Sequence, residues 1–68
     1  MPSSVIAHMS YDAATQVLRI VYLSGAVYDY LAVPEYEYQA MKQADSKGKY
    51  LNERIKAKYR FLKIQDEH

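Results

Sequence analysis

The segment QVLRIVYLSGAVYDYLA, residues 16–32, decides the fold of this chain. It contains two runs rich in β-branched and aromatic residues, which strands favour. The runs are separated by Ser24-Gly25, and glycine readily adopts the positive φ that tight hairpin turns require. The segment therefore predicts two antiparallel strands over residues 16–23 and 26–32.

Two tyrosines of the second strand share a sheet face with apolar residues of the first. Leu18, Ile20 and Tyr22 alternate onto this face, and the same period places Tyr28 and Tyr30 beside them. If helices cover this face, both tyrosines belong to the core. If helices cover the other face, the tyrosines form an exposed platform on which bases can stack. Because the apolar residues Leu18 and Ile20 lie on the same face, the first alternative, in which both tyrosines belong to the core, is favoured.

A third strand precedes the hairpin. Residues 5–10 are free of strand breakers, and Tyr11 to Thr15 resembles a turn in which Asp12 bonds backbone N–H groups two residues on. Three strands joined by short turns form an antiparallel meander.

Two helices follow the hairpin. Pro34 and two nearby glutamates favour a helix over residues 35–44, because proline and acidic side chains suit a helix N-terminus. Residues 45–48 interrupt it, with Asp45 or Ser46 able to cap the next helix. Leu51 and Ile55 recur at helical spacing and predict a second helix over residues 49–59.

The predicted fold class is α+β, with a three-stranded antiparallel β-meander followed by two α-helices packed on one face. Residues 3–64 form a single domain, and residues 65–68 form a loose tail. Residues 60–64 are consistent either with a continued helix or with an extended segment.

Composition narrows the function classes. The 68 residues hold no Cys, and the two histidines, His8 and His68, are far apart, so we expect no disulfide, metal or other cofactor. We also expect no membrane span or signal peptide and a cytoplasmic protein. His8 has no recognisable catalytic partner, and Ser24-Gly25 lacks phosphate-loop spacing, so a non-enzymatic protein is expected.

Positive charge is concentrated in residues 42–63. This segment holds eight Lys and Arg against two acids, a net charge of +6, within a chain whose total is only +1. Aromatic residues lie between the basic ones, a combination that suits single-stranded nucleic acid. The candidate phosphate-binding residues are Lys47, Lys49, Arg54, Lys56, Lys58 and Arg60, with Tyr50 as a ring for stacking.

Two other interpretations remain open. The basic residues are spread around the second helix, and a solvated face with a Glu53 to Lys56 pair explains half of them without a function. Alternatively, the helix-free sheet face is an apolar patch for a protein partner or for a second copy of the chain. The residues of that predicted patch are Val17, Val21, Val27 and Leu31.

Several short motifs, in order, resemble the KTSC domain family between Ser3 and Ile64. They are Ser3-Ser4-Val5-Ile6, Tyr11-Asp12, Leu18 to Tyr22 with Gly25, Tyr28-Asp29-Tyr30, Val33-Pro34, and the block Ala44, Ser46, Gly48, Tyr50-Leu51-Asn52, Ile55 and Tyr59. The sequence departs from the family pattern at Ser10, where glycine is frequent, and at Leu51, where an aromatic residue is usual.

The resemblance implies a module named for its occurrence at the C-terminus of some lysyl-tRNA synthetases, which also occurs as a stand-alone bacterial protein. The family's function is unknown, and its attachment to a synthetase implies RNA or tRNA as a partner. The motif residues that the resemblance marks are Tyr28, Tyr30, Ser46, Gly48, Asn52 and Tyr59.

Overall fold

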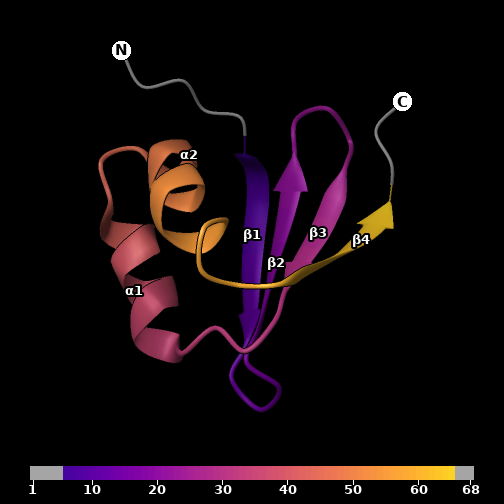
Figure 1. The fold of residues 1–68 in the computed structure, drawn as a ribbon. Helices are drawn as coiled ribbons and strands as arrows, with labels where there is room; N and C mark the ends of the chain where they lie inside the picture. The colour runs from indigo at the N-terminus through magenta and orange to yellow at the C-terminus, as the bar shows by residue number, and fades with distance from the viewer. Residues whose placement is uncertain (1–5, 66–68) are drawn as a thin grey trace.

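The computed structural model describes residues 6–65, which form one antiparallel sheet with helices on one side (Figure 1). The elements in chain order are β1 (Ile6–Asp12), β2 (Val17–Tyr22), β3 (Val27–Tyr30), α1 (Glu35–Gln43), α2 (Lys47–Tyr50), the π-helical segment η1 (Leu51–Ile55) and β4 (Phe61–Gln65). The α+β class is therefore confirmed.

The sheet has a fourth strand, so the prediction of three strands was wrong. Its order is β1-β2-β3-β4, and β4 pairs antiparallel with β3, bringing Phe61 opposite Tyr30 and Leu62 opposite Asp29. Of the two alternatives for residues 60–64, a continued helix or an extended segment, the structure shows the extended one. Gln65, which was expected in a loose tail, ends β4. The predicted domain also includes residues 3–5, and the predicted tail includes residues 66–68. Both ranges lie outside the described residues.

The turns follow the chemistry expected of them. Gly25 has a φ of 100°, which a residue with a side chain adopts only at a cost, and it closes the β2–β3 hairpin. The Ala14 N–H donates a 3.0 Å hydrogen bond to the Asp12 carboxylate, as predicted. β1 nevertheless continues through Asp12, two residues past its predicted end, because its last two residues still pair with β2.

The second helix is shorter than predicted and changes type. It starts at Lys47, where the Ser46 hydroxyl accepts a 3.2 Å hydrogen bond from the Lys49 N–H, so Ser46 is the cap. After Tyr50 the helix widens, and the Lys56 N–H reaches the Leu51 carbonyl at 2.8 Å, five residues back. The regular helix ends at Ile55, and a turn over residues 56–58 leads the chain toward β4.

The core lies between the sheet and the helical segments. The question of which sheet face the helices cover is thereby answered: it is the face of Leu18 and Ile20, the alternative that their apolar side chains favoured. Tyr30 is fully buried in this core, as the alternation of the hairpin predicted. The cluster consists of Leu18, Ile20 and Tyr30 from the sheet and Val33, Met41, Leu51 and Ile55 from the rest of the chain.

The helices cover only part of this sheet face. In Figure 1 they stand at the β1 side of the sheet, while β4 lies at the opposite edge. Tyr28 on β3 is consequently only half-buried, and Phe61 on β4 is 49% exposed. The sheet therefore carries an uncovered aromatic area on the same side as its helices.

Candidate nucleic-acid interface

Three rings make up the uncovered area, which we call the aromatic surface: Tyr22, Tyr28 and Phe61. Tyr28 and Phe61 are stacked, with ring centroids 5.0 Å apart and an interplanar angle of 22°. Tyr22 meets Tyr28 edge to face at 5.3 Å. Side chains of neighbouring antiparallel strands on one face lie close enough for such contacts. The register thus builds a continuous apolar surface from β2, β3 and β4.

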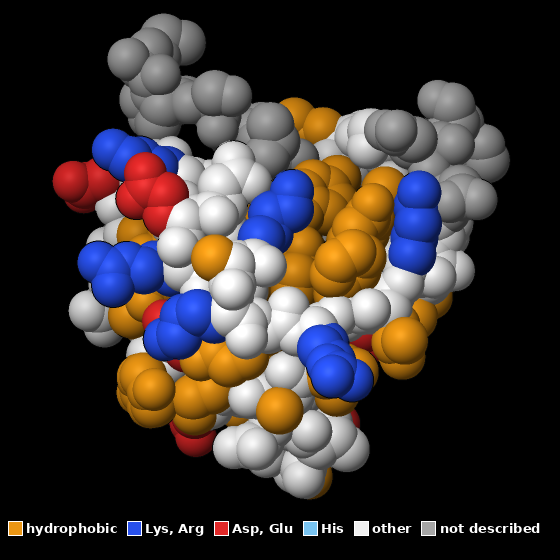
Figure 2. Space-filling model, in the orientation of Figure 1, with side chains coloured by type: hydrophobic (Ala, Val, Ile, Leu, Met, Phe, Trp, Pro, Cys, Tyr) orange, Lys and Arg blue, Asp and Glu red, His pale blue; other side chains and the backbone are white. Residues whose placement is uncertain are grey.

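Two lysines, Lys63 and Lys56, lie next to the aromatic surface. The Lys63 ammonium lies 5.8 Å from the centre of the Tyr28 ring, within the range of a cation–π contact. A hollow of about 160 Å³ opens beside it and is lined by Tyr22, Ser24, Ala26, Tyr28 and Lys56. Figure 2 shows an apolar area on this side of the molecule bordered by separate Lys and Arg side chains.

The tyrosine hydroxyl groups behind this surface are held in their neutral form. The Tyr22 and Tyr30 hydroxyls are 3.2 Å apart and hydrogen-bonded to each other. Burial raises the pKa of Tyr30 well above its ordinary value, and the hydrogen bond to Tyr22 raises it further. Burial also raises the pKa of Tyr22. The raised pKa values keep these two hydroxyls, of Tyr22 and Tyr30, in their neutral form.

The start of the second helix forms a separate hollow of mixed charge. A hollow of about 470 Å³ is lined by the predicted residues Lys49, Tyr50 and Arg54, together with Ala44, Asp45, Ser46 and Glu53. Two carboxylates share this hollow with two cations, so their charges largely offset one another. A polyanion would gain less there than the number of basic residues in the sequence indicates.

Three predicted residues converge on one buried carboxylate. Glu37 of α1 is 4% exposed and accepts hydrogen bonds from the hydroxyls of Tyr50 and Tyr59 and, at 3.3 Å, from the Lys58 ammonium. Burial alone would raise the pKa of Glu37, but the three donors outweigh it and lower the pKa below its usual value. Tyr50 and Lys58 are therefore tied to the fold, which weakens the prediction that they contact nucleic acid.

The other three predicted binding residues lie at the surface. Lys47, Lys56 and Arg60 are exposed, and the Arg60 carbonyl accepts a 2.8 Å hydrogen bond from the Leu31 N–H that helps to place β4. Among the family-motif residues, Gly48 is buried in the first turn of α2 and Asn52 is exposed on η1.

Sequence reasoning missed Tyr22 as a binding residue, and within residues 60–64 it missed Phe61 and Lys63. The signal was present, because the extended alternative for residues 60–64 places these two side chains on one face by the period of a strand. Choosing that alternative required knowing that β3 leaves an edge free for pairing.

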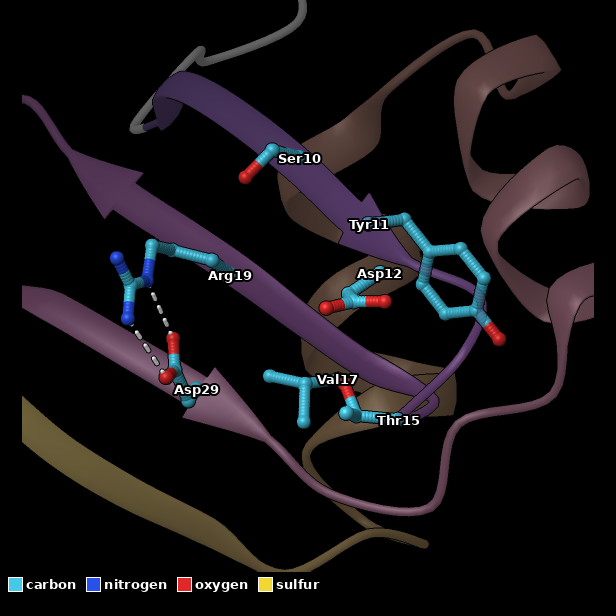
Figure 3. Close-up of a pocket in the computed structure, with 7 residues that line it drawn as sticks. All are labelled: Ser10, Tyr11, Asp12, Thr15, Val17, Arg19 and Asp29. Atoms are coloured by element: carbon cyan, nitrogen blue, oxygen red, sulfur yellow. Dashed lines mark hydrogen bonds and ion pairs between the residues drawn. The ribbon is translucent and has the colours of Figure 1, made fainter.

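The opposite sheet face carries an ion pair at its centre. The Arg19 guanidinium donates to the Asp29 carboxylate at 2.7 Å and 2.9 Å, and Figure 3 shows the two side chains pointing toward each other. They line an open pocket of about 370 Å³ together with Ser10, Tyr11, Asp12, Thr15 and Val17. The Tyr11 ring turns away, and its hydroxyl donates to the Val33 carbonyl at 2.6 Å.

The four residues of the predicted apolar patch lie around this ion pair. Each is half-buried, so the face is less apolar and less exposed than the sequence indicated. They are Val17, Val21, Val27 and Leu31.

Residues 6–65 contain neither a membrane-spanning helix nor a cluster of metal-ligand side chains. None of the helices described there has the length and apolar character to cross a bilayer. In the same part of the chain, no three His, Asp or Glu side chains gather as metal ligands would.

Comparisons with known proteins agree on one family. The sequence profile of the KTSC domain matches residues 2–59. An uncharacterised protein of Stutzerimonas stutzeri is 38% identical, over 94% of this chain and 92% of its own length. The crystal structure of a KTSC domain protein from Yersinia pestis is similar with a TM-score of 0.85 and 34% identity, covering 96% of this chain and 94% of that one.

A longer protein contains a similar segment. The lysine–tRNA ligase of Nostoc punctiforme is 43% identical over 61 residues, which are 90% of this chain but only 11% of the ligase. The chain thus spans about a tenth of the length of that ligase. It spans more than nine-tenths of the length of the Stutzerimonas stutzeri protein and of the Yersinia pestis protein. From the match of the profile over most of its length and the shared fold, the chain belongs to the KTSC domain family.

Proposed function

We propose that this domain is a non-enzymatic accessory module of the cytoplasm that binds nucleic acid, RNA or tRNA in the first instance, through its basic second half. The similarity to a segment of a lysine–tRNA ligase supports RNA as the polyanion. Attachment to such an enzyme does not fix the function of a domain, whereas the charge on its surface bears directly on binding.

One observation carries the proposal. All eight Lys and Arg side chains of residues 42–63 are exposed, although the segment also supplies Leu51 and Ile55 to the core. With its two acids, the segment has a net charge of +6 on a chain whose total charge is +1. Each phosphate that a lysine or arginine neutralises releases condensed counterions, which favours association.

Titration of a labelled tRNA pool tests the proposal. We expect a dissociation constant of about 1 to 100 μM at physiological salt, with much tighter binding at low salt. Replacement of Lys47 and Lys56 by Gln removes two exposed charges and weakens binding. Glu53→Gln, which removes an exposed acid from the same segment, strengthens it. An absence of binding at low salt, at concentrations on the order of tens of micromolar, contradicts the proposal.

A second candidate function, self-association, is favoured by one feature of β4. Leu62 and Ile64 are 55% and 49% exposed, and β4 forms an edge of the sheet. An exposed apolar edge strand is a ready template for pairing with another chain. The Arg19–Asp29 ion pair in the same sheet face opposes this interpretation. Light scattering decides it, because a monomer at high concentration excludes a stable homodimer.

A further inference from the structure

We infer that the aromatic surface selects unpaired bases, so that the domain's preferred ligand is single-stranded RNA rather than a duplex. The inference rests on the proposed function, since it assigns a ligand class to a surface next to the basic segment. It moves the stacking site from Tyr50, where the sequence placed it, to Phe61 and Tyr28.

The ring of Phe61 is more accessible to a base than the ring of Tyr50 is. Tyr50 is half-buried, and its hydroxyl is held by Glu37. Phe61 is 49% exposed on an edge strand, and it extends the half-buried Tyr28 ring into a stacked pair. Every base has a π-face that can stack on such a pair, whatever the sequence.

Positively charged side chains lie beside these rings. Lys63 lies over the Tyr28 ring, and Lys56 lines the adjoining hollow with Tyr22 and Tyr28. Phosphates on either side of a stacked base would meet these two lysines. Aromatic rings bordered by cations are the arrangement by which proteins bind single strands without sequence readout.

Duplex RNA cannot use the aromatic surface in the way that a single strand can. Bases in a duplex are stacked on each other, and a protein reads such RNA through its phosphates and 2′-hydroxyls. The rings of the aromatic surface would gain nothing from those groups. Only an unpaired base can use Phe61 and Lys63 together.

The experiment compares three probes at one low salt concentration. They are an oligouridine of about ten nucleotides, an abasic strand of the same length, and an RNA duplex of similar length. Phe61→Leu keeps an apolar side chain at an exposed position but removes the ring. We expect it to weaken oligouridine binding about fivefold or more and to leave binding of the abasic strand and the duplex unchanged.

Tyr36→Leu is the matched control, because Tyr36 is 69% exposed but lies on α1. It should leave all three affinities unchanged. If Phe61→Leu binds oligouridine as wild type does while neutralisation of Lys47 and Lys56 still weakens binding, the inference is wrong and the proposed function stands. If none of the probes binds, both are wrong.

Discussion

The hydroxyl of Tyr59 donates a 2.8 Å hydrogen bond to the carboxylate of Glu37, 22 residues earlier in the chain. Tyr50 and Lys58 bind the same carboxylate, so three side chains that follow α1 converge on one buried acid of that helix. An unpaired buried carboxylate would be costly, whereas a fully hydrogen-bonded one fixes the position of its partners. This cluster therefore sets where the basic half of the molecule lies against α1.

Replacement of Glu37 should destabilise the fold. Glu37→Gln removes the charge and turns one hydrogen-bond acceptor into a donor that faces the donors around it. We expect a loss of about 1 to 3 kcal/mol in the free energy of unfolding, measured by urea denaturation. Glu35→Gln, at an exposed position in the same first turn, should cost far less. Equal losses for the two variants would show that the cluster contributes nothing specific.

The same carboxylate predicts a loss of stability in acid. The pKa of Glu37 is lowered in the folded state from an ordinary value of 4.5. Its contribution is therefore complete above pH 4.5 and is lost as the pH falls through the lowered folded pKa. In urea unfolding at a series of acidic pH values, stability should fall more steeply in wild type than in Glu37→Gln. Parallel pH profiles would rule out this role.

High pH should also destabilise the fold, through tyrosines whose pKa values are raised in the folded state. Burial raises the folded-state pKa values of Tyr30 and Tyr59 above their ordinary value of 10.0, and their hydrogen bonds add to the effect. The stability from these groups is complete below pH 10 and is lost as the pH rises toward the folded pKa values. Tyrosinate absorbance just above pH 10 should be lower in the native protein than in the urea-unfolded chain. Identical titration curves would contradict the burial of these hydroxyls.

A glycine substitution should be tolerated at Ala32 and not at Ala40. Ala32 has a φ of 57°, in the left-handed region where a Cβ is unfavourable, while Ala40 is exposed inside α1. We expect Ala32→Gly to stay within about 0.5 kcal/mol of wild type or to be more stable. Ala40→Gly should cost about 1 kcal/mol. A larger loss at Ala32 than at Ala40 in thermal or urea unfolding would be the contrary result.

Much of the fold was predictable because it is encoded locally. The alternation of Leu18 and Ile20 identified the buried sheet face, and Gly25 identified the hairpin. Ser46 proved to be the helix cap, for the reason that its side chain indicated. Such features depend on neighbours within a few residues, which a pattern in the sequence contains.

The remainder depends on contacts between distant residues. β4 is a short strand whose partner Tyr30 lies 31 positions before Phe61, and nothing near Phe61 specifies that pairing. Glu37 looked like an ordinary acid at a helix start, and its three donors come from elements that only the tertiary fold brings near it. The aromatic surface combines three strands, so the predicted binding residues include only Lys56 at its border. Tyr28 was predicted only as a family-motif residue.

The salt dependence of oligouridine binding tests the central claim most directly, that exposed lysines beside the aromatic surface contact phosphate. The slope of log Kobs against log salt is about −0.7 per phosphate contact for a single strand. We predict that replacing Lys56 and Lys63 by Gln makes this slope shallower by about 1.4 and weakens binding at low salt. An affinity that does not change with salt in the wild type, or a slope that is unchanged in the double variant, would contradict the account.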